Sequence, residues 1–257
     1  MKIDLVLAPN PGPFTGAGTN TYLVGDDDSV VILDPGPVIG AHEVAIAAAV
    51  AGRAVQSVIV THTHSDHAPL ANPLARAFGV AALGYRPGPD FEPDALLSDG
   101  DAVEAGTEAM VVVHTPGHSD DHLCFLAGRA LFTGDHIMGG SSVMVEDLGP
   151  YMASLEKLQR FDLDRLLPGH GPEIGQPAEV ISWYLAHRRQ REAEIVAAIA
   201  GGSATVGEIV ERVYAEVDTS LHPLAAISVA AHLKKLADEK LVVVSGSGWT
   251  AAVEPRR

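Results

Sequence analysis

The sequence predicts an α/β protein: a layered α/β sandwich in residues 1–177, followed by a smaller, mainly helical domain in residues 178–257. A chain of 257 residues with 47% apolar and 19% charged residues is long enough for one to two folded domains and too apolar for disorder. Residues 1–177 hold 8 Lys and Arg against 23 Asp and Glu, a net charge of −15; residues 178–257 hold 9 against 10, a net charge of −1. This difference in charge indicates two domains with different surfaces.

The first region alternates short apolar runs with turns and helix-like segments. Strands are expected over residues 20–24, 29–33, 55–60, 110–113, 122–126, 130–133 and 165–167. Helices are expected over residues 41–51, from Pro69 to about Phe78, and over 151–160. Antiparallel strands at the start, followed by strands mixed with helices, are typical of a layered α/β sandwich.

The second region has a different pattern. A long helix over residues 178–199 ends at Gly201-Gly202, and the capping box Thr205–Glu208 opens a helix through Val217. Pro223 precedes a third helix over 225–239, and residues 241–253 read as two strands around Ser-Gly-Ser-Gly. Helix, helix, helix and hairpin is the order of a winged helix.

Composition argues against several classes of protein. No apolar stretch is long enough to span a bilayer, and the N-terminus carries Asp4 and reaches Pro9 too soon for a secretory signal. The single cysteine, Cys124, excludes an intramolecular disulfide, and we expect it in the apolar core rather than on a metal. We therefore expect a soluble, cytoplasmic protein with no membrane partner and no disulfide partner.

The chemistry is concentrated where expected strands end. Thr61–His67 follows the apolar run Val58–Val60 and holds His62, His64, Asp66 and His67. Three later turns, each containing glycine or proline, hold His118, Asp135 and His170. Imidazole and carboxylate are ligands that zinc prefers when thiolates are absent, although manganese or iron could use the same groups. Five histidines and two aspartates suit two zinc ions about 3.5–4 Å apart with a shared carboxylate.

Other polar residues near these turns have two interpretations. Asp34 either accepts a hydrogen bond from a ligand histidine or simply forms a turn. His122 and His136 are expected to support ligands or the fold rather than to catalyse. The cluster Arg188–Arg191 and the pair Lys234–Lys235 could meet phosphates, but we expect them on solvated helix faces.

The motif Thr61–His67, followed in order by Thr-Pro-Gly-His118, Gly-Asp135 and Pro-Gly-His170, resembles the metallo-β-lactamase superfamily. The resemblance implies a four-layer αββα sandwich. It also implies roles for the ligands: His62, His64 and His118 would hold one zinc, Asp66, His67 and His170 the second, and Asp135 would bridge them. True β-lactamases of this superfamily carry Cys or Ser at the bridging position. Asp135 instead resembles the glyoxalase II, lactonase and nuclease branches, so we do not expect antibiotic hydrolysis.

A narrower resemblance covers almost the full length. Residues 18–24, 115–122, 145–155 and 231–236 are similar to the β-lactamase-like protein 2 subgroup. Members of that group append a winged-helix domain to the catalytic domain, and the best-known one is an endoribonuclease. The resemblance therefore implies single-stranded RNA as one substrate class.

Three functions remain open. The first is a dizinc hydrolase of an RNA phosphodiester, in which a metal-bridging hydroxide attacks and Asp66 orients it; no general acid is evident. The second is the same chemistry on a small ester, thioester or lactone. The third is a winged-helix regulator whose metal domain senses a ligand. The complete ligand set favours a hydrolase, but the first domain's charge of −15 opposes RNA, and a near-neutral winged helix more often shapes a pocket or a dimer than grips nucleic acid.

Overall fold

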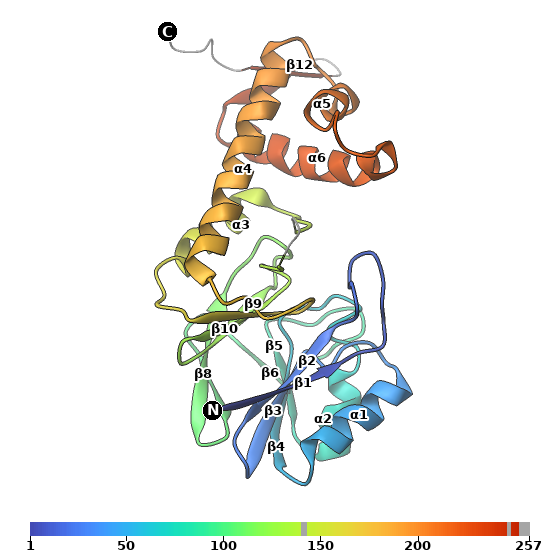
Figure 1. Cartoon of the computed structure of the whole chain (residues 1–257), viewed down its shortest axis with the longest axis vertical. Helices are drawn as coiled ribbons and strands as arrows, with labels where there is room; N and C mark the ends of the chain where they lie inside the picture. Colours follow the sequence, from blue (N-terminus) through green and yellow to red (C-terminus); the bar gives the residue numbers. More distant parts are fainter. Residues whose placement is uncertain (140–142, 246–247, 252–257) are drawn as a thin grey trace.

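A computed structural model describes residues 1–139, 143–245 and 248–251 (Figure 1). The first part of the chain forms two β-sheets that pack face to face, with helices on both outer faces. The second part is a smaller helical domain, joined to the sandwich by one long helix. The predicted order of a layered sandwich followed by a helical domain is therefore confirmed.

The first sheet has six strands in the order β1-β2-β3-β4-β5-β6. They are β1 (Lys2–Leu7), β2 (Asn20–Gly25), β3 (Ser29–Leu33), β4 (Ala54–Ile59), β5 (Ala81–Gly84) and β6 (Ala95–Leu96). The pairs β1/β2 and β2/β3 are antiparallel, whereas β3, β4, β5 and β6 run parallel. Parallel strands place their carboxyl ends at one edge, so the turns that follow β3 and β4 meet there.

The second sheet has five strands in the order β11-β10-β9-β8-β7. They are β7 (Ala102–Ala105), β8 (Glu108–His114), β9 (Leu123–Ala127), β10 (Ala130–Gly134) and β11 (Arg165–Pro168). Only β10 and β11 are parallel, and both are followed by a predicted ligand turn.

Apolar side chains form three clusters in the sandwich, one between each pair of adjacent layers. Between the sheets, Leu33 and Ile59 pack in one cluster with Phe125 and Phe132 of the other sheet. Outside the first sheet lie α1 (Gly40–Val50) and α2 (Ala71–Phe78), which share a cluster with its other face. Outside the second sheet lie α3 (Leu148–Leu158) and the start of α4 (Pro177–Ala200). The layers are therefore α, β, β and α.

The second domain has its own apolar core. It consists of α5 (Val206–Val213), a short 3-10 helix (Thr219–Leu221), α6 (His222–Asp238) and the hairpin of β12 (Val242–Ser245) and β13 (Gly248–Ala251). The predicted capping box at Thr205 and Glu208 is present. Ile195 and Ile199 of α4 belong to this core, whereas Ile181 and Tyr184 of the same helix belong to the sandwich. Because α4 contributes to both cores, the domain division between residues 177 and 178 stays a prediction.

Several elements differ from the sequence-based expectation. The strands β1, β5, β6 and β7 were not predicted, and α3 begins at Leu148 rather than at residue 151. The missed strands are short or, as in β1, mostly exposed, so they lack a strong apolar pattern. Within the described residues, no helix is long and apolar enough to cross a membrane.

Candidate metal centre and adjoining pocket

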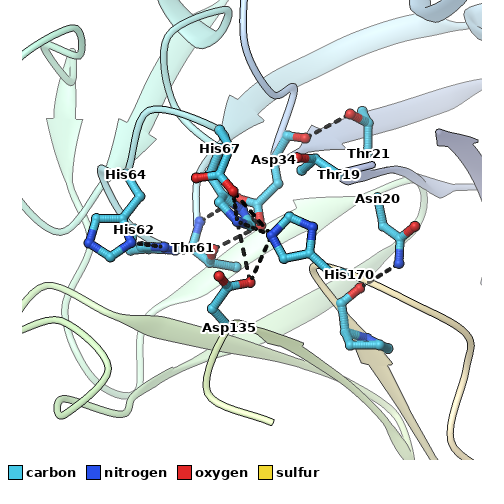
Figure 2. Close-up of polar contacts among 12 residues, drawn as sticks. Thr19, Asn20, Thr21, Asp34, Thr61, His62, His64, His67, Asp135 and His170 are labelled. Atoms are coloured by element: carbon cyan, nitrogen blue, oxygen red, sulfur yellow. Dashed lines mark hydrogen bonds and ion pairs between the residues drawn. The ribbon is translucent and has the colours of Figure 1, made fainter. Parts of the chain in front are cut away.

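The predicted ligands converge at one edge of the two sheets (Figure 2). Thr61–His67 follows β4, His118 lies between β8 and β9, Asp135 follows β10 and His170 follows β11. Their donor atoms form two groups, each within 4.8 Å: His62, His64 and His118 in the first, and Asp66, His67, Asp135 and His170 in the second. All seven residues singled out in the sequence are thus brought together.

The first group consists of three ring nitrogens around one point. His64 Nδ1 lies 2.9 Å from His62 Nε2 and 3.0 Å from His118 Nε2. One imidazole nitrogen carries at most one proton, so these three atoms cannot all satisfy one another by hydrogen bonds. Three convergent imidazole nitrogens are the donor set of a metal such as zinc.

The second group adds carboxylates to imidazoles. His67 Nε2 and His170 Nε2 are 3.2 Å apart, and Asp135 Oδ1 lies 3.3 Å from the first and 3.4 Å from the second. Asp66 Oδ2 lies 3.2 Å from His170 Nε2. The other oxygen of Asp135, Oδ2, lies 3.7 Å from His118 Nε2 in the first group. The Asp135 carboxylate therefore faces both groups, which suits a bridging ligand.

The outer nitrogens of the imidazoles are held by oxygen atoms. Nδ1 of His62, His67, His118 and His170 lies 2.8–3.1 Å from Thr61 Oγ1, Asp34 Oδ2, Met144 O and Gly18 O, respectively. A carbonyl or carboxylate accepts only, so the Nδ1 atoms of His67, His118 and His170 are the donors. Each of these rings keeps Nε2 for the centre of the site, as in metal-binding histidines generally.

These contacts fit a divalent metal in each group. Asp135 Oδ1 is buried and lacks a hydrogen-bond partner among the described residues, although two imidazoles face it. A cation between these atoms would satisfy the carboxylate and both Nε2 atoms at once. The Cys124 thiol is fully buried in the core and is not in either group, as predicted.

Asp34 contacts a ligand of the second group directly and a ligand of the first group through Thr61. Its Oδ2 accepts hydrogen bonds from His67 Nδ1 at 2.9 Å and from Thr61 Oγ1 at 2.8 Å, and Oδ1 accepts one from the Thr61 amide at 2.7 Å. Because the Thr61 hydroxyl donates to Asp34, it accepts from His62 Nδ1. Of the two interpretations of Asp34, the structure favours the acceptor for a ligand histidine (Figure 2).

His122 and His136 are buried and belong to neither group of candidate ligands. His122 Nε2 accepts the Asp135 amide at 3.1 Å and so helps to fix that ligand. Gly134 has a φ of +46°, and a Cβ there would lie 2.6 Å from His122 Nε2, so this turn requires glycine. His136 is buried, and burial lowers its pKa to about 3, which keeps it neutral.

Two residues that hold the ligand turns were not singled out in the sequence. Asn20 Nδ2 donates to Pro168 O at 2.9 Å and to Gly171 O at 2.8 Å, on either side of His170. Asp121 Oδ2 accepts from the amide and the hydroxyl of Thr63, at 3.0 and 2.7 Å. Both lie within segments that are similar to the β-lactamase-like protein 2 subgroup, residues 18–24 and 115–122, and this similarity could have drawn attention to them.

The electrostatics of the second group favour ionised carboxylates. Burial raises the pKa of Asp66, but the hydrogen bond with His170 and the charge of His67 outweigh it and leave the pKa below its ordinary value. Burial likewise opposes ionisation of Asp135, and the neighbouring imidazoles hold its pKa well below the usual range. Burial lowers the pKa of His170, but hydrogen bonds to Asp135 and Asp66 raise it to about 9. Metal binding at neutral pH would therefore displace a proton from His170.

A pocket of about 850 Å³ opens from the metal centre toward the second domain. His64, Asp66, His118 and Asp135 lie on one side of it, and side chains of α4 and α6 lie on the other. Much of the remaining lining is apolar, including Phe14, Val145, Leu148, Leu224 and Ile227. The second domain thus helps to shape a pocket.

One expectation about this wall was wrong. Arg188 was expected on a solvated helix face, but it is only 3% exposed and lines the pocket. His232 on α6 is also buried against the pocket. Arg189, by contrast, is exposed as expected. Helical spacing alone does not tell which side chains of α4 pack against the sandwich and which face solvent.

Comparison with known families agrees with this geometry. Residues 14–170 match the model of the metallo-beta-lactamase superfamily, and residues 205–249 match the beta-lactamase associated winged helix domain. The chain belongs to the metallo-β-lactamase superfamily. Its predicted four-layer αββα sandwich and its winged-helix domain are both confirmed.

Relatives in the superfamily cover nearly the whole chain. A "Beta-lactamase-like protein 2 homolog" of Drosophila melanogaster is 32% identical and covers 94% of this chain and 90% of that protein. An "Atrochrysone carboxyl ACP thioesterase" of Aspergillus chevalieri is 34% identical, covering 93% and 82%. The solved structure of a beta-lactamase domain protein from Burkholderia ambifaria has a TM-score of 0.82 at 23% identity, covering 97% and 91%.

These relatives confirm the predicted class of enzyme. The chain is a metal-dependent hydrolase of the metallo-β-lactamase superfamily, with a His and Asp cluster suited to metal binding. The resemblance to the β-lactamase-like protein 2 subgroup is also confirmed. The alternative of a non-enzymatic regulator is therefore set aside.

Proposed function

We propose that this superfamily member binds two zinc ions and hydrolyses an ester or thioester whose acyl group is bulky and apolar. The observation that carries the proposal is the pocket of about 850 Å³ beside the metal centre, with its largely apolar lining. A pocket of that size and character is typical of sites that bury most of a small organic molecule. A relative of which this chain covers 82% carries the name of a thioesterase, and that name supports the same class of substrate.

The proposed roles follow from the two groups. His62, His64 and His118 would hold one ion, Asp66, His67 and His170 the other, and Asp135 would contact both. When bound, the two metals would supply Lewis acidity and an activated water. Manganese or iron would suit the same oxygen and nitrogen donors, so metal analysis decides the native ion.

Asp66 is the proposed catalytic residue. It is ionised, its side chain is 25% exposed, and it lines the pocket, whereas Asp135 is almost fully buried. Its carboxylate would orient the attacking water and accept its proton. The water oxygen then joins the acyl carbon, the bond to the leaving oxygen or sulfur breaks, and the proton passes to the leaving group.

RNA stays a prediction that the same experiment tests. Single-stranded RNA is usually bound by a groove with several cations and stacked aromatic rings. The pocket wall offers two arginines, Arg188 and Arg191, and one of them, Arg191, already pairs with Glu194. An apolar acyl group therefore suits this wall better than a phosphate backbone does.

The test is metal analysis followed by a substrate panel. We expect about two zinc ions per chain, and turnover of S-N-acetylcysteamine thioesters of octanoate and benzoate that exceeds cleavage of single-stranded RNA. Asp135→Ala should lose both the metal and the turnover. Asp162→Ala, which changes an exposed aspartate paired with Arg129, should retain both. Protein with no bound metal, or RNA cleavage without thioester hydrolysis, would contradict the proposal.

A further inference from the structure

Arg188 is a buried cation in the wall of the pocket. It lies on α4, is 3% exposed, and donates from Nη2 to the carbonyl of Val143 at 2.6 Å. Its guanidinium lies over the Tyr151 ring, with Cζ 5.3 Å from the ring centroid. The buried Nε–H has no hydrogen-bond partner among the described residues. A buried donor without a partner is costly, so its retention beside a pocket indicates a ligand.

The charge of Arg188 is also unpaired within the described part of the chain. Its neighbours on α4 form ion pairs, Arg189 with Glu156 and Arg191 with Glu194, whereas no described carboxylate forms one with Arg188. The two aspartates that line the pocket, Asp66 and Asp135, belong to the metal centre.

The surroundings of Arg188 agree with an excess of positive charge. Burial lowers the pKa of His232 to about 3, and the charges of Arg188 and Arg191 add to that effect. The same two arginines, after burial, lower the pKa of His187. In a chain with a net charge of −16, Arg188 therefore adds an unpaired positive charge to this wall, whereas Arg191 pairs with Glu194.

We propose that Arg188 binds a carboxylate carried by the acyl group of the substrate, and thereby selects acidic acyl substrates over neutral ones. This inference rests on the proposed hydrolysis of an acyl substrate and adds a charged substituent to it. One end of the acyl group would lie at the metal centre, and its carboxylate would reach the wall formed by α4.

The number of charges favours a carboxylate. One unpaired guanidinium balances a single negative charge, and its planar donors match the two oxygens of a carboxylate. A phosphate monoester carries nearly two negative charges at neutral pH and would leave one of them unbalanced in an apolar pocket.

A purely structural role for Arg188 makes a different prediction. Arg188 binds the carbonyl of Val143, and the adjacent carbonyl of Met144 accepts from His118 Nδ1. If Arg188 only held this segment, its loss would lower turnover of charged and neutral substrates by the same factor. The ratio of the two activities therefore separates recognition from support.

The experiment uses matched pairs of S-N-acetylcysteamine thioesters with the zinc-loaded chain of residues 1–257. Suberoyl is compared with octanoyl, and sebacoyl with decanoyl, so that each pair differs only in a terminal carboxylate. We expect the wild type to prefer the carboxylate member of at least one pair by tenfold or more in kcat/KM. Arg188→Met should abolish the preference, Arg188→Lys should retain part of it, and Arg189→Met should leave it unchanged.

Two results would overturn the proposal: no preference in any pair, or a preference that persists in Arg188→Met. If Arg188→Met does not fold, the proposal is tested by the preference of the wild type and by whether that preference falls in Arg188→Lys. Calorimetric binding of thioether analogues, in which CH₂ replaces the carbonyl, needs no turnover. If the thioesters are not hydrolysed but the carboxylate thioether binds tenfold more tightly through Arg188, the proposed function is wrong and the carboxylate site stands. If the thioesters are hydrolysed without any preference for the carboxylate, the proposed function stands and the carboxylate site is wrong.

Discussion

Replacing Asp34 with asparagine should weaken metal binding at both groups, although Asp34 itself is in neither. One carboxylate oxygen, Oδ2, accepts from His67 Nδ1 in the second group and from Thr61 Oγ1, which contacts His62 Nδ1 in the first. An asparagine side chain has one acceptor oxygen and one donor nitrogen. With the amide oxygen in the place of Oδ2, His67 Nδ1 and Thr61 Oγ1 keep only a neutral, weaker acceptor, and the amide nitrogen of the new side chain faces the Thr61 amide N–H. In the opposite orientation both of these donors face an N–H group, so the contacts that support the two groups are weakened in either case.

The magnitude follows from the bonds that are lost. A buried hydrogen bond to a charged group contributes about 1.5–3 kcal/mol. Since about 1.4 kcal/mol corresponds to a factor of ten, losing one such bond should weaken zinc binding by about 10–100-fold. Loss of an outer partner of a metal ligand has effects of about this size.

Thr61→Val provides the matched control. Valine has nearly the shape of threonine but no hydroxyl, so it removes the contact with His62 Nδ1 and leaves the bond between Asp34 and His67 in place. We expect it to weaken only the first group, whereas Asp34→Asn weakens both.

The assay is a competition titration of zinc against a chromophoric chelator, which resolves two affinities per chain. Circular dichroism of each variant checks that the fold is retained. Wild-type affinities at both groups in Asp34→Asn would refute the reasoning, as would an equal loss at both groups in Thr61→Val.

Three further predictions concern catalysis and stability. Asp66→Ala should lower kcat by about 100-fold or more while the thermal unfolding profile of the metal-free protein stays close to that of the metal-free wild type, because the water loses its acceptor; turnover near wild type would exclude that role. Removing the metals with a chelator should lower the Tm by about 5–10 °C, since a site filled at 100 times its Kd adds about 2.7 kcal/mol, and zinc should restore it; an unchanged Tm would argue against metal binding. The pKa of His232 is lowered from 6.5 to about 3, mainly by burial, so the unfolded chain gains this proton first and stability falls as the pH drops below 6.5. From pH 7 to pH 5 this residue should cost the wild type about 2 kcal/mol that His232→Leu does not lose, as measured by urea unfolding; an equal loss in both proteins would contradict it.

The candidate ligands could be predicted because their positions follow from local sequence. All seven follow apolar strands, and three of them, His118, Asp135 and His170, lie in turns with glycine or proline. The resemblance of Asp135 to the glyoxalase II, lactonase and nuclease branches stays a prediction. Their pairing into two groups came from the family resemblance and agrees with the distances in the structure.

The pocket could not be predicted because it depends on how two domains meet. Arg188 lies in a basic run that was expected on a solvated helix face because the second domain is nearly neutral in charge, but α4 packs on the segment around Val143 and Arg188 is buried there. The short strands β5, β6 and β7 were missed for a related reason. Their pairing with neighbouring strands stabilises them, and two to four residues hold too little pattern to predict that.

The helix α4 separates, along the sequence, the residues proposed for catalysis from many of those proposed to bind the substrate. The residues proposed to hold the metals all precede it, whereas the wall that would contact the acyl group comes from α4 and the domain beyond it. Substitutions on that wall can alter which molecule is accepted while the bond-breaking machinery stays intact. A protein built in this way can acquire new substrates during evolution by changing one side of a pocket, and an engineer can follow the same route.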